Sequence, residues 1–333
     1  MSNRKANLYA VILIVLTACA KESTPPTSGT AEASSNNTLL WRNPFQNQLP
    51  DPGTGTGTTF GLMEANADNN ETQTDMANGD VNLVREPIFL SEATSSKTID
   101  DFLESGYNVQ INANWYSAAN GTRGFPTNID QVKARAEDFF QYYAPYKNQI
   151  PFVAIENEWD YDAQHGGSIP DYLAELSAIT DVAHKYGFKV SDGAITGTAL
   201  RRWMYSQLSG DEQDEWKQDY YIGLNYDYDE IMDIVNTFID GVQNINIDYL
   251  NVHWYNVTGC YYGFETATQT YLEACNKKLL VCNEFGIRTN SLNLFDQTVD
   301  EIKQGNPVYA IAYSGGNKDN SVQLTDAMLG DLH

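Results

Sequence analysis

From Thr59 onward the chain alternates short apolar runs with longer amphipathic segments, and this alternation limits the possible folds most strongly. Segments 128–146, 171–187 and 293–305 carry apolar residues at helical spacing. Eight apolar runs have the length of buried strands: 59–63, 81–84, 107–113, 151–155, 188–194, 248–254, 278–285 and 307–313. Eight strand and helix units in about 275 residues predict one domain, a (β/α)8 TIM barrel with a parallel sheet.

The helical segments differ in how clearly the sequence marks them. Asn128 and Asn293 are expected to cap helix N-termini, and Gly187 and Gly305 to end helices. The first two helical segments, at about 66–78 and 95–105, are weak, and a missing helix would open the barrel. A doubly wound open sheet is therefore the alternative fold.

The first 58 residues differ from the rest of the chain. Arg4 and Lys5 precede an apolar stretch at 8–18 that is too short to span a bilayer, so residues 1–18 are predicted to be a signal peptide. The sequence LTAC, ending at Cys19, resembles the bacterial lipobox, which implies that Cys19 is lipidated. Ala20, in place of the Asp found in inner-membrane lipoproteins of enteric relatives, favours an outer-membrane or surface anchor on a Gram-negative cell.

Residues 19–58 are rich in Ser, Thr, Pro, Gly and Asn, which predicts a flexible linker before a domain at 59–333. The formal net charge is −24, and removal of the leader with its two basic residues would leave about −26. Such a surface disfavours nucleic acid and favours neutral partners. We expect a monomer that meets the membrane through its lipid only.

Cysteine spacing gives no sign of a metal site. Cys260 and Cys275 could form a disulfide in an exported protein, and Cys282 is expected to be a buried free thiol. The sequence has no CxxC pair, HExxH stretch, GxSxG elbow or P-loop. We therefore expect neither a metal nor a cofactor.

Two strand ends carry the residues with the clearest chemistry. The fourth run ends in Asn157, Glu158 and Trp159, and the seventh contains Glu284. The C-terminal strand ends of a barrel form its active site. A glutamate at the mouth of each of two strands is what glycoside hydrolysis requires, although either one alone could be a surface ion pair. Glu156 is a rival acid that we expect to lie deeper and to pair with a basic residue.

These residues resemble clan A of the glycoside hydrolases, in particular family 5-like barrels, which carry the acid/base glutamate in an Asn-Glu pair after the fourth strand and the nucleophile after the seventh. The resemblance implies that Glu158 is the general acid and Glu284 the nucleophile of a retaining reaction. Arg85 in LVRE and the pair His253 and Tyr255 in VHWY also fit this pattern, and Arg85 and Tyr255 would keep Glu284 ionised. The chain departs from it in reading NEW instead of NEP, and in lacking a Trp after the eighth run.

Flat aromatic faces at strand ends can stack on sugar rings, although Trp254 could instead cap the barrel core. The candidate substrate-binding residues are Arg85, Asn157, Trp115, Trp159, His253, Tyr255 and Trp254. The expected substrate is a neutral β-linked polysaccharide of the glucan, mannan or xylan type. The alternatives are a non-catalytic glycan-binding lipoprotein on a barrel scaffold and a transglycosylase with the same carboxylates. Asn112 and Asn114 could reach sugar hydroxyls or satisfy loop backbone.

Overall fold

The computed structural model describes residues 57–64, 69–115, 124–160, 167–211, 213, 228–256, 263–315 and 323–332. The predicted leader, Cys19 and nearly all of the linker lie outside these residues, as do residues 212, 214–227 and 257–262, which include Cys260. In the described part of the chain, no helix is long and apolar enough to cross a membrane.

All strand pairs in the sheet are parallel, in the order β5-β4-β3-β2-β1-β9-β8-β7-β6. The strands are β1 (Thr59–Glu64), β2 (Leu83–Phe89), β3 (Asn108–Asn114), β4 (Val153–Ile155), β5 (Val190–Asp192), β6 (Ile195–Thr196), β7 (Leu250–Asn256), β8 (Leu280–Ile287) and β9 (Tyr309–Ser314). Strands fall on all eight predicted runs, and β2 extends five residues past the predicted end at 84.

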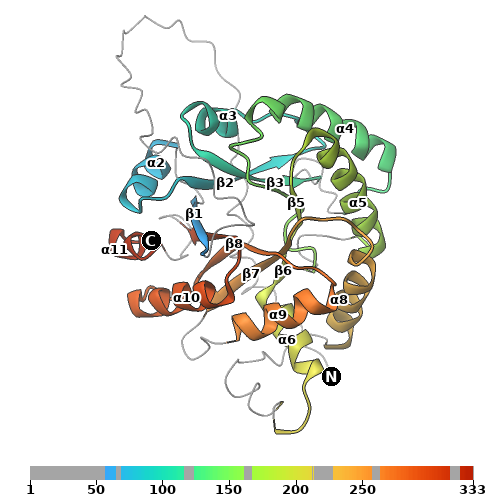
Figure 1. The fold of residues 1–333 in the computed structure, drawn as a ribbon, viewed down its shortest axis with the longest axis vertical. Coiled ribbons are helices and arrows are strands. Elements are labelled where there is room, and N and C mark those ends of the chain that lie inside the picture. The colour runs from blue at the N-terminus through green and yellow to red at the C-terminus, as the bar shows by residue number, and fades with distance from the viewer. Residues whose placement is uncertain are drawn as a thin grey trace, which may run out of the picture.

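The sheet closes on itself because β5 and β6 are two parts of one barrel strand. Gly193 and Ala194 interrupt this strand, and Ala194 has a φ of 73°. β6 pairs with β7, while a bridge between Ser191 and Tyr249 joins β5 to the residue before β7. The fold is therefore a (β/α)8 barrel with its helices outside the strands (Figure 1), and the doubly wound alternative is wrong.

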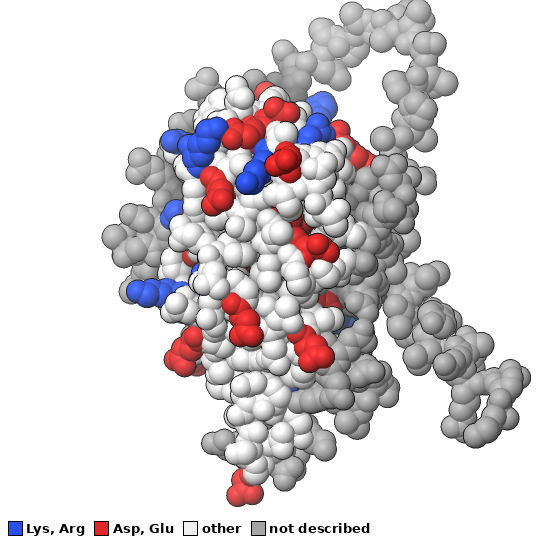
Figure 2. Space-filling model, turned by 90° about the vertical axis from the view of Figure 1, so that its right-hand side faces the viewer, with Lys and Arg blue, Asp and Glu red and all other residues white. Residues whose placement is uncertain are grey.

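Helices lie between successive strands, including the two weakly predicted ones. They are α2 (Asn69–Asn78), α3 (Lys97–Glu104), α4 (Ile129–Tyr143), a short 3-10 turn η2 (Ala144–Tyr146), α5 (Ile169–Tyr186), α6 (Gly197–Gln207), α8 (Tyr228–Val242), α9 (Phe264–Ala274), α10 (Leu292–Gly305) and α11 (Asp326–Gly330). Figure 2 shows the face that α4 and α5 cover, where acidic and basic side chains intermix over the upper part. Lys185 and Glu137 pair across these two helices at 2.7 Å.

The predicted helix ends hold on α4 and α5, and on α10 the predicted end at Gly305 holds while the predicted N-cap is wrong. Asn128 accepts a hydrogen bond from the Gln131 N–H, and Gly187 ends α5 in the left-handed conformation. In α10 the N-cap is Ser291 instead of Asn293, and the left-handed C-cap is Asn306, one residue after Gly305. An Asn and a Gly near a helix end do not by themselves locate the cap to the residue.

Side chains of opposite parity on the strands form two cores. One set packs between the sheet and the helices, and the other fills the barrel. The barrel-filling set includes Phe152, Tyr249 and Tyr309, whose ring centroids lie 5.6 to 6.3 Å apart. Leu83 belongs to this set, and Arg85, two residues further along β2, has the same parity and is 4% exposed. The buried Arg85 side chain therefore enters the barrel.

Candidate active site

The backbone after β4 adopts an uncommon conformation that presents Glu158. Glu156 and Glu158 both have left-handed φ values, 68° and 49°. The Glu156 N–H donates to the Ala113 carbonyl at 3.0 Å, and the Glu158 N–H donates to the Gly193 carbonyl at 2.7 Å. A Cβ at Gly193 would lie 2.5 Å from the Ile155 carbonyl oxygen. Only glycine at position 193 lets its segment approach the end of β4 this closely. The hydrogen bond to the Gly193 carbonyl then supports the left-handed conformation of Glu158, which residues other than glycine rarely adopt.

A β-bulge in β8 turns two consecutive side chains to the barrel interior. Asn251 pairs with Val281, but His253 pairs with Glu284, so two positions along β7 face three along β8. Asn283 contacts Asn251 and His253 while Glu284 contacts Tyr255. Without the bulge, strict alternation would point one of the two away from the interior.

Three groups surround the Glu284 carboxylate, which is 14% exposed. Arg85 Nη1 forms an ion pair with Oε2, the Tyr255 hydroxyl donates to Oε1 at 2.7 Å, and His253 Nδ1 lies 4.0 Å from Oε1. Burial alone would raise the pKa of Glu284, but the charges of His253 and Arg85, with the Tyr255 hydrogen bond, outweigh it and lower the pKa to about 2. Glu284 is ionised at neutral pH, as the residue pattern predicted.

Arg85 also connects Glu284 to the Asn-Glu pair. Its Nη2 donates to Asn157 Oδ1 at 2.6 Å, and its Nη1 donates to the Asn283 carbonyl at 3.1 Å. A buried guanidinium with several acceptors keeps one geometry, because its planar fork has five donors in fixed directions. Arg85 thereby links the end of β4 to β8 across the barrel.

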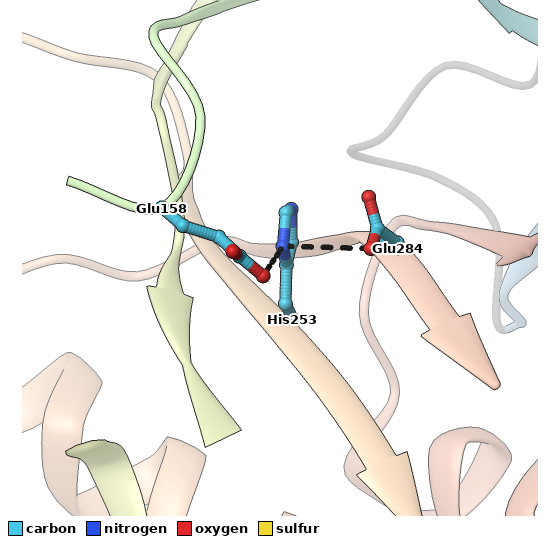
Figure 3. A group of neighbouring side chains, drawn as sticks. All are labelled: Glu158, His253 and Glu284. Carbon is cyan, nitrogen blue, oxygen red and sulfur yellow. Dashed lines mark hydrogen bonds and ion pairs between the residues drawn. The ribbon is translucent and has the colours of Figure 1, made fainter. Parts of the chain in front are cut away.

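His253 lies between the two candidate catalytic carboxylates (Figure 3). Its Nδ1 is 2.9 Å from Glu158 Oε1, and the side chain of Glu158 is 17% exposed. One oxygen of Glu158, one oxygen of Glu284 and a ring nitrogen of His253 all lie within 4.8 Å of one another. Burial lowers the pKa of His253, but the charge of Glu284 and the hydrogen bond and charge of Glu158 more than offset this and raise the pKa above its usual value.

The same three residues form the group of His, Cys, Asp and Glu in the described chain that could hold a metal ion. The Arg85 guanidinium already binds one Glu284 oxygen, and the Tyr255 hydroxyl binds the other. A cation placed here would have to displace or face Arg85 at short range, which like charges oppose. The cluster is better suited to moving protons than to holding a metal.

Six of the sequence-predicted residues come together in one site: Arg85, Asn157, Glu158, His253, Tyr255 and Glu284. Trp115 follows β3 and is half-buried, and its backbone N–H donates to Glu156 Oε1 at 2.6 Å. The Trp115 side chain packs in part against the core between sheet and helices, and its role as a sugar platform stays a prediction.

The predictions that Trp159 and Trp254 face a substrate are wrong, because both belong to the core. Trp159 is 2% exposed, stacks on Phe238 at 4.0 Å and donates its indole N–H to Asp192. Trp254 is fully buried beneath the Arg201 guanidinium, which lies 3.7 Å from its ring centroid. Position near a strand end does not reveal which side of the sheet a side chain faces.

The side chain of Glu156, which is 1% exposed, faces Glu175, a fully buried acid on α5. The basic partner expected for Glu156 stays a prediction. Burial, together with the Glu156 charge, raises the pKa of Glu175 well above its usual value, so Glu175 holds a proton. Cys275 and Cys282 are both buried free thiols in the structure, as expected for Cys282. The possible disulfide between Cys260 and Cys275 stays a prediction, because Cys260 lies outside the described residues.

Sequence reasoning missed a polar network beneath the catalytic glutamates. Asn283, Asn251 and Gln110 are fully buried, and Asn112 is 2% exposed. Asn112 therefore bonds other interior groups, one of them the Glu156 carbonyl, instead of a sugar. A usable signal existed for Asn251, since it shares the parity of His253 and Tyr255. None existed for Asn283, because the bulge breaks the alternation.

Comparison with known proteins supports the fold and does not assign a family. No protein-family model and no protein of curated function matches the chain. A glucosidase from Croceicoccus marinus has a TM-score of 0.60 at 11% identity, over 83% of this chain and 67% of its own. A family 39 glycoside hydrolase from Bacteroides cellulosilyticus WH2 has a TM-score of 0.52 at 11% identity, over 83% of this chain and 62% of its own.

Fungal β-1,4-galactanases are similar over 84% of this chain and 94% of theirs, with a TM-score of 0.50 at 12% identity. The chain spans about two thirds or less of the length of the glucosidase and of the family 39 glycoside hydrolase. At such identities the likeness concerns the fold, which is one that glycoside hydrolases adopt.

Proposed function

We propose that this protein is a retaining glycoside hydrolase of clan A, with Glu284 as the nucleophile and Glu158 as the general acid and base. The observation that carries the proposal is the pair of carboxylates at the C-terminal barrel face, with one oxygen of each within 4.8 Å of the other. Retaining enzymes hold their two carboxyl groups about 5 to 5.5 Å apart, whereas inverting enzymes leave about 6.5 to 9.5 Å for a water. The short separation favours direct attack by one carboxylate.

The contacts suit each glutamate to one role. Glu284 is ionised and attacks the anomeric carbon, while the glycosidic bond breaks and the leaving oxygen takes a proton from Glu158. The products of this step are a glycosyl ester on Glu284 and an ionised Glu158. A water then gives a proton to Glu158 as its oxygen attacks the anomeric carbon, which frees Glu284 and restores the starting state.

The proposed substrate is a neutral β-linked polysaccharide of the glucan, mannan or xylan type. The net charge of −24 disfavours a polyanion. Trp115 offers a half-buried aromatic side chain at the end of β3, where a sugar ring could stack. The names of the glucosidase and galactanases that share the fold support a sugar polymer without selecting one.

The test is hydrolysis of a panel of β-glucans, mannan and xylan, with reducing ends measured over time. We expect release by the wild-type protein and at least about a 10³-fold loss in Glu284→Gln. Glu104→Gln, at an exposed position on α3, is the matched control and should hydrolyse normally. Proton NMR of the first-formed anomer tests retention, and an inverted product would overturn the double displacement.

Two outcomes would favour other functions. Binding of a glycan without release of reducing ends would support a non-catalytic glycan-binding protein. Products longer than the substrate would support a transglycosylase that uses the same two carboxylates.

We also propose that Cys19 carries a lipid anchor after removal of residues 1–18. Radiolabelled palmitate should enter the full-length protein in a Gram-negative host and be absent from Cys19→Ala. Equal labelling of both would overturn the anchor, and fractionation of the membranes would test the outer-membrane location.

A further inference from the structure

Two backbone groups set the orientation of the Asn251 side-chain amide. Its Oδ1 accepts from the Asn283 N–H at 3.1 Å, and its Nδ2 donates to the Asp192 carbonyl at 3.1 Å. A backbone N–H can only donate and a carbonyl can only accept, so flipping this amide would break both bonds. The second Nδ2 proton of Asn251 points to Asn283 Oδ1, 2.8 Å away.

The Asn283 amide is oriented from both of its ends. Asn251 donates to its Oδ1, and its Nδ2 donates to Asn112 Oδ1 at 3.1 Å. Asn112 is itself fixed, because its Nδ2 donates to the Glu156 carbonyl at 3.0 Å. These two anchors come from opposite sides of the barrel and agree that the Asn283 oxygen faces β7.

That oxygen lies 2.9 Å from His253 Nε2. It has no hydrogen to donate, so Nε2 must carry the proton that joins the pair. The other ring nitrogen, Nδ1, lies 2.9 Å from Glu158 Oε1. We propose that Asn283, oriented by Asn251, is a positioning residue that keeps His253 protonated at Nε2, so that the contact between Nδ1 and Glu158 holds one proton.

This inference rests on the proposed function, since it gives His253 a part in the acid chemistry of Glu158. When the ring is neutral, the shared proton belongs to Glu158; when Glu158 is ionised, the ring must be a cation. A neutral ring beside an ionised Glu158 would set two lone pairs against each other. The charged groups that face the ring are Glu158, Glu284 and Arg85, and Asp192 lies behind Asn251, whose N–H it accepts at 2.8 Å.

The arrangement has a consequence for the glycosylation step. With both ring nitrogens protonated, Glu158 releases a proton from Oε2 to the leaving oxygen while Nδ1 continues to donate to Oε1. The imidazolium then faces the carboxylate that this transfer produces. His253 thus stabilises the ionised Glu158 that must act as the base in the second step.

The protonation of the ring can be read directly by long-range ¹H–¹⁵N NMR on protein labelled at histidine. The chain has four histidines, and a His253→Gln sample identifies the signals of His253. We expect a proton on Nε2 at every pH at which the protein is folded, with only Nδ1 titrating. A neutral ring with its proton on Nδ1 and a bare Nε2 would overturn the inference, whether or not the protein hydrolyses glycans.

Variants at Asn283 separate positioning from packing. Asn283→Thr replaces a fixed acceptor by a hydroxyl that can also donate, so the neutral ring should then populate the Nδ1–H form. We expect about a tenfold or greater loss of kcat with KM nearly unchanged, and an altered pH profile. Asn283→Asp keeps an acceptor towards His253 and should retain the Nε2 proton. Asn256→Thr, at a buried Asn of the neighbouring strand β7, is the control for general disruption and should leave the ring unchanged.

The outcomes of the two proposals are distinguishable. An Nε2 proton in a protein that releases no sugar would support this inference on the ring and overturn the hydrolase. Hydrolysis by a protein whose Asn283→Thr variant keeps the wild-type ring tautomer and pH profile would overturn the role of Asn283 and leave the hydrolase standing.

Discussion

Replacement of Arg85 by methionine should destabilise the protein strongly, because it leaves the Glu284 charge buried with fewer partners. The pKa of Glu284 falls from 4.5 to about 2 in the fold, and at about 1.4 kcal/mol per pKa unit this is a preference of about 3 kcal/mol for the ionised form. Removing one partner of a buried ion pair costs about 3 to 5 kcal/mol. We therefore expect Arg85→Met to lower the free energy of unfolding by about 3 kcal/mol at pH 7.

The measurement is urea unfolding followed by tryptophan fluorescence, with a thermal scan beside it. A loss of this size corresponds to a decrease of roughly 6 to 12 °C in Tm. Glu284→Gln and the double variant complete a double-mutant cycle. The double variant should lose about 2 kcal/mol less stability than the sum of the two single losses. A coupling below about 0.5 kcal/mol would refute the account of Glu284 and Arg85 as a mutually dependent pair.

The pH dependence of the wild-type protein gives a second check. Because the pKa of Glu284 is lower in the folded state, its ionisation stabilises the protein above pH 4.5, and this contribution is lost as the pH falls from 4.5 towards 2. The difference in stability between the wild-type protein and Arg85→Met should narrow over the same range. A gap that stays constant from pH 7 to pH 3 would contradict the electrostatic origin of the effect.

Two further predictions concern the support beneath Glu158. Gly193→Ala should displace the end of β4, because the new Cβ would lie 2.5 Å from the Ile155 carbonyl oxygen. We expect a lower Tm and slower hydrolysis. Gly124→Ala is the control, because a Cβ there meets open space, and it should leave both unchanged. Glu175→Gln should stabilise the protein at pH 8 by more than the roughly 0.5 kcal/mol of a surface change. The pKa of Glu175 is raised in the folded state, so protonated Glu175 contributes its full stability below pH 4.5, and this contribution is lost as the pH rises. Glutamine has no proton to lose and avoids this cost at pH 8. The gain should vanish near pH 4, and unfolding curves for Glu104→Gln should show no such pH dependence.

The sequence by itself was enough to determine the barrel, because apolar period and strand-helix alternation are local properties of the chain. Eight runs and the helices between them predicted a (β/α)8 fold. The ends of the fourth and seventh runs predicted Glu158 and Glu284 as candidate catalytic residues. Arg85, His253 and Tyr255 followed from the same reasoning with a family resemblance added. A closed parallel barrel has one C-terminal face, so residues at these strand ends necessarily meet there.

Only the tertiary structure decided which side chains face the interior and which groups bond there. A bulge in β8 turns Asn283 inward beside Glu284, and no periodic pattern contains that extra residue. Trp159 and Trp254 pack into the core, and the buried Glu156 faces the acid Glu175 on α5. These outcomes depend on contacts between segments far apart in the chain. Such contacts form only when the strands pair, so a local sequence pattern does not reveal them.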